Sequence, residues 1–244
     1  RKFLRKLFFF FDSNLILMDE KMYIDKPAII SIHPHGLIPF GSIINLTLDN
    51  KRLELCDKNL PILKDKTIAG GASFNYFFPI IREFYLLLGA VDCSKPILDK
   101  FLKKGNGISV FLGGARESGY SGKGSTKVVV NNRWGIFKMA LENGISIIPV
   151  YTFNENNLFK SLISENRVLE FFHKKTGLWI PVGRIFFNKL KYFTVIGEEI
   201  KVKRKNVITN SDIDELRELY KEGLQNIFKK YVSQADLVVF LIDI

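Results

Sequence analysis

The sequence has little cysteine and no long uninterrupted apolar stretch. Only two of its 244 residues are cysteines, Cys56 and Cys93, which is too few for a disulfide framework or a four-cysteine zinc site. This usage indicates a reducing environment such as the cytosol or the cytosolic face of a membrane. The longest uncharged window, Pro27 to Leu48, is interrupted by prolines and glycines and does not offer the roughly 20 apolar residues of a spanning helix.

Several familiar reaction motifs are also missing. Gly119 to Ser125 lacks the Gly-Lys-Ser/Thr order of a P-loop, and Gly122-Lys123-Gly124 is not completed to a dinucleotide fingerprint. No Gly-x-Ser-x-Gly nucleophile elbow occurs, which argues against a serine hydrolase. Neither cysteine, nor His173, stands at a metal-like spacing from the other histidines, so no metal site is expected.

The composition is that of a folded, basic protein. Hydrophobic residues make up 47% and charged residues 25%, and 36 Lys and Arg against 25 Asp and Glu give a net charge of +11. Such a chain can bury a core. Its charge attracts polyanions, which include nucleic acid, anionic lipid head groups and a nucleotide-bearing thioester.

The chain reads as one α/β domain, because strands and helices alternate without repeats or linkers. Residues 1–23 are interpreted as a lead-in whose basic and aromatic start, Arg1 to Phe11, is typical of either a membrane-interface segment or a packed amphipathic helix. Residues 24–244 form the domain. Expected strands are Pro27–Ile32, Ala90–Val91, Gly107–Leu112, Ile145–Tyr151 and Tyr192–Ile200, and expected helices are Pro39–Leu48, Phe74–Leu88, Lys95–Lys104, Asn131–Asn143, Leu158–Lys175 and a last helix with a capping box from Ser211 to Asp214.

Two segments at predicted strand ends carry candidate chemistry. Ser31-Ile32-His33-Pro34-His35-Gly36 holds two of the three histidines, and histidine is the usual general base near neutral pH. Gly113-Gly114-Ala115-Arg116-Glu117 follows the next long strand, and its glycines and backbone N–H groups suit an oxyanion or a phosphate. Each segment also has a structural reading, as a polar tight turn and as a flexible loop with a solvated ion pair.

Five motifs in order resemble the type-2 diacylglycerol acyltransferase family, which includes monoacylglycerol acyltransferases and wax synthases. They are His33-Pro34-His35-Gly36, Pro79–Glu83, Gly113–Glu117, Arg133–Leu141 and Ile148–Phe153. The resemblance implies a glycerolipid-acyltransferase-like fold, with a largely parallel or mixed sheet flanked by helices. It also implies a membrane-associated enzyme on the cytosolic face of the endoplasmic reticulum that moves an acyl group from acyl-CoA to a neutral lipid.

Roles for the site residues follow from the resemblance together with the chemistry of a thioester. His35 is the expected general base, with Gly36 leaving room for substrate, His33 supporting it or sharing the role, and Glu117 accepting a hydrogen bond from the imidazole. Gly113 and Gly114 would supply space and N–H donors. The expected contacts to the CoA phosphates come from Arg82, Arg116 and Arg133. No bound cofactor or metal is expected.

The sequence also departs from the family. The His-x4-acid partner is absent, since Ile38 and Phe40 stand at those positions; Asn154 replaces the usual glycine; and an upstream hydrophobic hairpin is missing. Diacylglycerol is the favoured acceptor, with monoacylglycerol, a fatty alcohol or a lysophospholipid as alternatives. Thioester hydrolysis and a non-catalytic basic module built on Lys201–Lys205 for nucleic acid or membrane are the competing readings; no nucleic-acid motif accompanies that run.

Overall fold

The computed structural model describes residues 13–43, 45–46, 57–87, 89–122, 125–157, 159–161, 168, 171, 183–185, 192–235 and 242–243. Their elements in chain order are β1 Ser13–Leu17, β2 Ala28–His33, α2 Phe40–Ile43, α4 Pro61–Asp65, β3 Thr67–Gly71, η2 Ser73–Phe77, α5 Pro79–Leu87, β4 Ala90–Asp92, α6 Lys95–Lys103, β5 Gly107–Phe111, α7 Gly114–Ser118, β6 Val128–Val129, α8 Trp134–Asn143, β7 Ser146–Phe153, η3 Glu155–Asn157, β8 Phe159–Ser161, β9 Gly183–Ile185, β10 Tyr192–Ile196, α10 Asn210–Tyr231, η4 Val232–Ala235 and β11 Ile242–Asp243.

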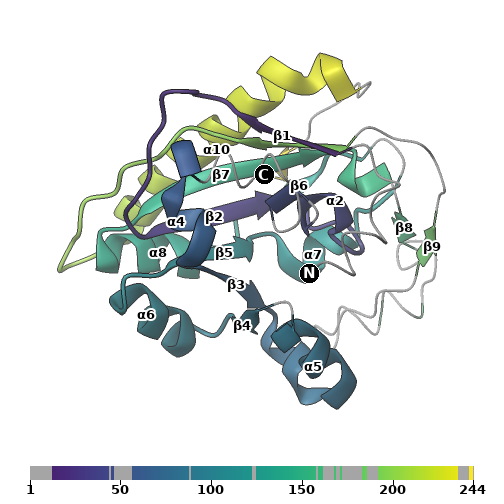
Figure 1. Cartoon of the computed structure of the whole chain (residues 1–244), viewed down its shortest axis with the longest axis horizontal. Helices are drawn as coiled ribbons and strands as arrows, with labels where there is room; N and C mark the ends of the chain where they lie inside the picture. The colour runs from purple at the N-terminus through teal and green to yellow at the C-terminus, as the bar shows by residue number, and fades with distance from the viewer. Residues whose placement is uncertain are drawn as a thin grey trace.

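A seven-stranded mixed sheet forms the centre of the molecule (Figure 1), with the strand order β1-β10-β7-β2-β5-β3-β4. The five strands from β7 to β4 run parallel, whereas β10 is antiparallel to β7 and β1 is parallel to β10. This confirms the predicted α/β class with a mixed sheet. Because β2 lies between β5 and β7, its carboxyl end is placed in the middle of one sheet edge.

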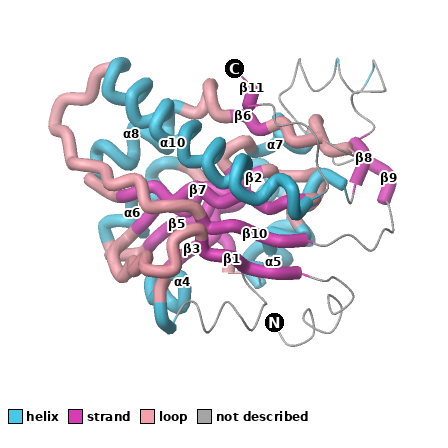
Figure 2. Tube along the Cα trace, turned by 90° about the horizontal axis from the view of Figure 1, so that it is seen from above, coloured by secondary structure: helices cyan, strands magenta, loops and turns pink. Residues whose placement is uncertain are grey.

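Both faces of the sheet are covered, as the alternation of side chains along β2 shows. Ile29 packs into a core that it shares with residues of α6, α8 and α10, while Ile30 packs into a second core that includes residues of α4. Figure 2 shows α8 and α10 on one side of the strands and α4 on the other. Burial on both faces explains why β2 and β7 read as continuous apolar runs.

Parts of the chain differ from the predicted elements. The expected helix Phe74–Leu88 is two elements, η2 and α5, because Pro79 begins a new helix. Residues 13–17 of the expected lead-in form edge strand β1, while 1–12 lie outside the described residues. The start of the expected helix Leu158–Lys175 is strand β8, paired with β9, and Val168 and Phe171 are helical.

The capping box of α10 lies two residues before the expected pair, Ser211 and Asp214. Thr209 is the N-cap: its hydroxyl accepts the N–H of Asp212 at 3.2 Å, and the Asp212 carboxylate accepts the Thr209 N–H at 2.8 Å. The contact with the Lys205 side chain, together with these bonds to Thr209, lowers the pKa of Asp212 to about 2. Ser211 and Asp214, the hydroxyl and carboxylate residues expected to form the box, therefore lie inside the helix.

Replacing Thr209 with alanine should lower the free energy of unfolding by about 1 kcal/mol, because one orphan N–H of the first turn loses its acceptor. Ser211→Ala is the matched control, since Ser211 is exposed within the helix and should change stability little. Urea unfolding followed by circular dichroism measures both. A larger loss for Ser211→Ala would contradict the assignment of the cap.

Candidate active site

The buried carboxylate of Glu117 joins the two candidate segments. It lies in α7, which forms part of the stretch expected to be a loop, and it is 0% exposed. Its Oε1 accepts His33 Nδ1–H at 2.6 Å and the N–H of Val129 at 2.7 Å. Its Oε2 accepts the backbone N–H of His35 at 2.7 Å. One side chain thus holds both ends of the His-Pro-His sequence.

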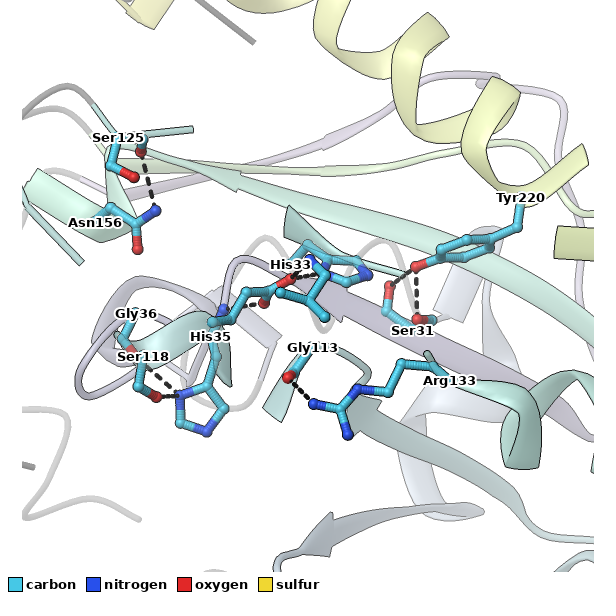
Figure 3. Close-up of polar contacts among 12 residues, drawn as sticks. Ser31, His33, His35, Gly36, Gly113, Ser118, Ser125, Arg133, Asn156 and Tyr220 are labelled. Atoms are coloured by element: carbon cyan, nitrogen blue, oxygen red, sulfur yellow. Dashed lines mark hydrogen bonds and ion pairs between the residues drawn. The ribbon is translucent and has the colours of Figure 1, made fainter. Parts of the chain in front are cut away.

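The imidazole that contacts Glu117 is that of His33, not that of His35 as expected. His33 is the last residue of β2, and it lies on the same face as Ser31, toward α10 (Figure 3). Its ring centroid is 6.0 Å from that of Tyr220, whose hydroxyl shares a 2.6 Å hydrogen bond with Ser31 Oγ. His33 is completely buried, and its Nε2 has no hydrogen-bond partner among the described residues.

His35 is turned the other way, and its ring is only partly buried. Its Nδ1 lies 2.8 Å from the Gly36 carbonyl oxygen and 2.8 Å from Ser118 Oγ (Figure 3). Because a carbonyl oxygen can only accept, Nδ1 carries a proton there, and Nε2 of the neutral ring is left as an acceptor. Burial lowers the pKa of His35 below its usual 6.5, although Glu117 opposes the shift. The ring is therefore neutral at pH 7, which is the form a base requires.

Gly113 and Gly114 lie at the start of α7, where other groups fill the space beside them. A Cβ on Gly113 would lie 2.0 Å from the Glu117 carboxyl carbon, so the expected room for substrate is taken by Glu117. Gly114 has a φ of +54° and packs near Arg133. The Arg133 guanidinium donates to the Gly113 carbonyl, and burial lowers its pKa while Glu117 raises it.

The three expected phosphate contacts are not gathered at one point. Arg133 lies beside Gly113, and Arg116 is exposed on α7 close enough to influence it electrostatically. Arg82 lies on α5, where it pairs with Glu83 at 3.8 Å. It lines a separate hollow of about 390 Å³ with Tyr76, Leu86, Val91, Asp92, Ile97 and Phe101.

Sequence reasoning missed a second buried glutamate, Glu155, which lies beside Gly36 and Gly41. It begins η3, separated by one residue from the end of β7, and accepts hydrogen bonds from the first turn of α2. Burial raises its pKa to about 7, against the opposing effect of those hydrogen bonds. Its position after the carboxyl end of a central parallel strand was a usable signal, because such ends share one edge of a sheet.

The basic run of the competing reading lies away from this site. Arg204 packs against Gly144, just before β7 begins, and Lys205 pairs with Asp212. The run therefore sits at the amino ends of the parallel strands, opposite the histidines.

Within the described part of the chain no three His, Cys, Asp or Glu side chains are grouped to hold a metal ion. No helix there is long and apolar enough to cross a bilayer.

The family model for diacylglycerol acyltransferase matches residues 2–239. The chain belongs to the diacylglycerol acyltransferase family. Family relatives include Diacylglycerol O-acyltransferase 2 of Dictyostelium discoideum, 30% identical over 86% of this chain and 67% of that protein. The human protein of that name is 30% identical over 86% of this chain and 58% of its own length, and the Bos taurus protein is 30% identical over 91% and 65%.

A solved structure has the same fold as this member of the diacylglycerol acyltransferase family. The 1-acyl-sn-glycerophosphate acyltransferase of Thermotoga maritima aligns with a TM-score of 0.53 at 16% identity, covering 93% of this chain and 77% of the other. This confirms the expected glycerolipid-acyltransferase-like fold. The chain spans about three fifths to two thirds of the length of the curated relatives named above.

A methyl group at Gly113 should displace the Glu117 carboxylate. Gly113→Ala is expected to lower the free energy of unfolding by about 1 to 3 kcal/mol, as overpacking of a filled site does. Gly135→Ala is the matched control, because an added Cβ there meets nothing within 4 Å, and the change should raise helix stability by up to about 1 kcal/mol. Equal stability of the two variants in urea unfolding would contradict the described packing.

Proposed function

We propose that this protein is an acyl-CoA-dependent diacylglycerol O-acyltransferase that forms triacylglycerol. The observation that carries the proposal is the placement of His35, a partly buried residue whose Nδ1–H is bound to Gly36 and whose backbone N–H is bound to the Glu117 carboxylate. Family membership supports these substrate classes, since the named relatives are diacylglycerol O-acyltransferases.

The reaction needs no covalent enzyme intermediate, because a thioester is already activated. Nε2 of His35 removes the proton of the lipid hydroxyl as the hydroxyl oxygen attacks the thioester carbonyl carbon. The tetrahedral intermediate then collapses, the bond from carbon to sulfur breaks, and the CoA sulfur takes the proton from the His35 imidazolium. The products are the new ester and free CoA thiol, so atoms and charges balance.

Glu117 supports this step without touching the substrates. Its carboxylate holds the backbone of His35, and its negative charge raises the pKa of that imidazole, which stabilises the imidazolium formed during the reaction. His33 donates a hydrogen bond to the other oxygen of the same carboxylate, and its side chain is completely buried. We therefore assign His33 a supporting role and His35 the role of base.

The CoA part of acyl-CoA carries anionic phosphates, which need cationic side chains near the site. Arg133 and Arg116 lie beside the Gly113–Gly114 turn and are the candidates for the CoA phosphates. Arg82 lies in its own hollow with apolar neighbours, which makes it a candidate for a more distant contact. Gly36 was expected to leave room for the acceptor, but a Cβ there would lie 3.2 Å from Glu155 Cγ, so Glu155 takes that space.

We place the reaction at the cytosolic face of the endoplasmic reticulum membrane, because both lipid substrates carry long acyl chains. Exposing such chains to water costs about 0.8 kcal/mol for each methylene group, so the acceptor reaches the site most readily from a lipid surface. The segment expected to contact this surface, Arg1 to Phe11, lies outside the described residues. The low cysteine content agrees with a cytosolic active site.

Replacing His35 with alanine should lower the transfer rate by about 10² to 10⁴-fold, the usual cost of losing a general base. The assay supplies labelled acyl-CoA with diacylglycerol in detergent, follows free CoA thiol, and separates the lipid products by chromatography. The unchanged melting temperature and acyl-CoA affinity of the variant are the controls for folding.

Three outcomes would contradict parts of this account. Full turnover by a folded His35→Ala protein would remove His35 from the mechanism. Free fatty acid as the labelled product of the wild type would show thioester hydrolysis. Faster transfer to a monoacylglycerol, a fatty alcohol or a lysophospholipid than to diacylglycerol, in a panel with one acyl-CoA, would change the assigned acceptor.

A further inference from the structure

Glu155 is a second buried carboxylate next to the His-Pro-His-Gly turn, and it has no part in the reaction as described above. It is 1% exposed. Its Oε1 accepts the N–H of Gly41 at 2.9 Å, and its Oε2 accepts the N–H of Ser42 at 2.7 Å and the Ser42 hydroxyl at 2.9 Å. Three donors from one short stretch thus converge on a single side chain.

Two glycines and a left-handed residue make room for this arrangement. A Cβ on Gly36 would lie 3.2 Å from Glu155 Cγ, and one on Gly41 would lie 3.0 Å from Glu155 Oε2. Gly36 has a φ of +61°, and Asn154 has a φ of +65°, a conformation that asparagine tolerates better than most residues. Glu155 therefore lies between the two ends of the segment Gly36 to Ser42.

We propose that Glu155 is a positioning residue for His35, because it holds the segment Gly36 to Ser42 so that the Gly36 carbonyl meets His35 Nδ1–H. The inference rests on the proposed role of His35 as the base. Glu117 holds the N–H of His35, and Glu155 holds the segment that follows it. Two buried carboxylates 38 positions apart in the chain thus hold the backbone of His35 and the segment after it.

Other polar groups near Glu155 lead away from His35 and provide a control. Ser42 Oγ lies 2.8 Å from Thr152 Oγ1, which in turn shares a 2.8 Å hydrogen bond with Thr194 Oγ1. The Asn45 side-chain amide donates to Thr194 Oγ1 at 2.8 Å. This buried chain ties α2 to β7 and β10, and a change at Thr152 should affect stability more than the orientation of His35.

Glu155→Gln keeps the shape of the side chain, but Gly41 and Ser42 donate to different oxygens, and the NH₂ group that replaces one of these oxygens cannot accept. The expected result is about a 10- to 100-fold lower kcat with an unchanged KM for acyl-CoA, because a misplaced base slows the chemical step without altering binding. In the His35→Ala background, Glu155→Gln should reduce the residual single-turnover rate no further. Such non-additivity is the signature of action through His35.

Two further variants keep the test decisive. Thr152→Val should lower the melting temperature and leave kcat within about twofold, which separates loss of stability from loss of positioning. Ser42→Ala removes one of the three donors and should reduce kcat by up to about tenfold, again only when His35 is present; it carries the test if Glu155→Gln does not fold.

The proposal is overturned by full kcat in a folded Glu155→Gln protein, or by an equal loss of rate in the wild-type and His35→Ala backgrounds. Both results leave the base role of His35 intact. Full activity of His35→Ala itself would remove that role, and the positioning role of Glu155 with it.

Discussion

The charge of Glu117 is buried, and the arrangement of the site depends on the donors that make this burial tolerable. A carboxylate in the interior of a protein is costly unless it is hydrogen-bonded. Glu117 receives three hydrogen bonds, from His33 Nδ1, His35 N and Val129 N. These donors come from β2, from the turn after it and from β6, so satisfying one side chain brings three segments together.

The same carboxylate gives two neighbouring histidines different surroundings. His33 ends β2 and points into the layer below α10, where its ring is enclosed and bound to Glu117. Pro34 follows, and His35 lies beyond the strand, with its ring beside Ser118 and its own Gly36. In the proposed function, the enclosed imidazole of His33 has a structural role, and the partly exposed His35 acts as the base.

The sequence predicted the parts of this structure that depend on local pattern. The buried runs around Ile29, Ile108 and Ile147 became adjacent parallel strands, and the helix expected over Asn131–Asn143 ends at Asn143 in the structure. Both candidate segments follow predicted strands, and the structure has them at the same edge of the sheet. The order of the five motifs pointed to the family that the whole-chain match then established.

Features set by distant contacts were not predicted. The path of the chain around Pro34 decides which histidine ring contacts Glu117. The two histidines lie 84 and 82 residues before Glu117, and this spacing does not predict which ring makes the contact. Glu155 reaches Gly41 across 114 residues, so its place after a central strand could mark it as a candidate but could not show which groups it binds. The strand at Phe159–Ser161 forms through its partner β9, against a pattern that favours a helix.

Glu117→Gln tests the central claim most directly, because glutamine preserves the shape of the side chain while one of its two ends turns from acceptor to donor. The measurement is kcat and the KM for acyl-CoA of the folded variant at saturating diacylglycerol. The account predicts at least about a 10-fold fall in kcat with the KM for acyl-CoA unchanged, since the base is disturbed and the cofactor contacts are not. A raised KM with an unaltered kcat would contradict it, and would place Glu117 in the acyl-CoA binding site.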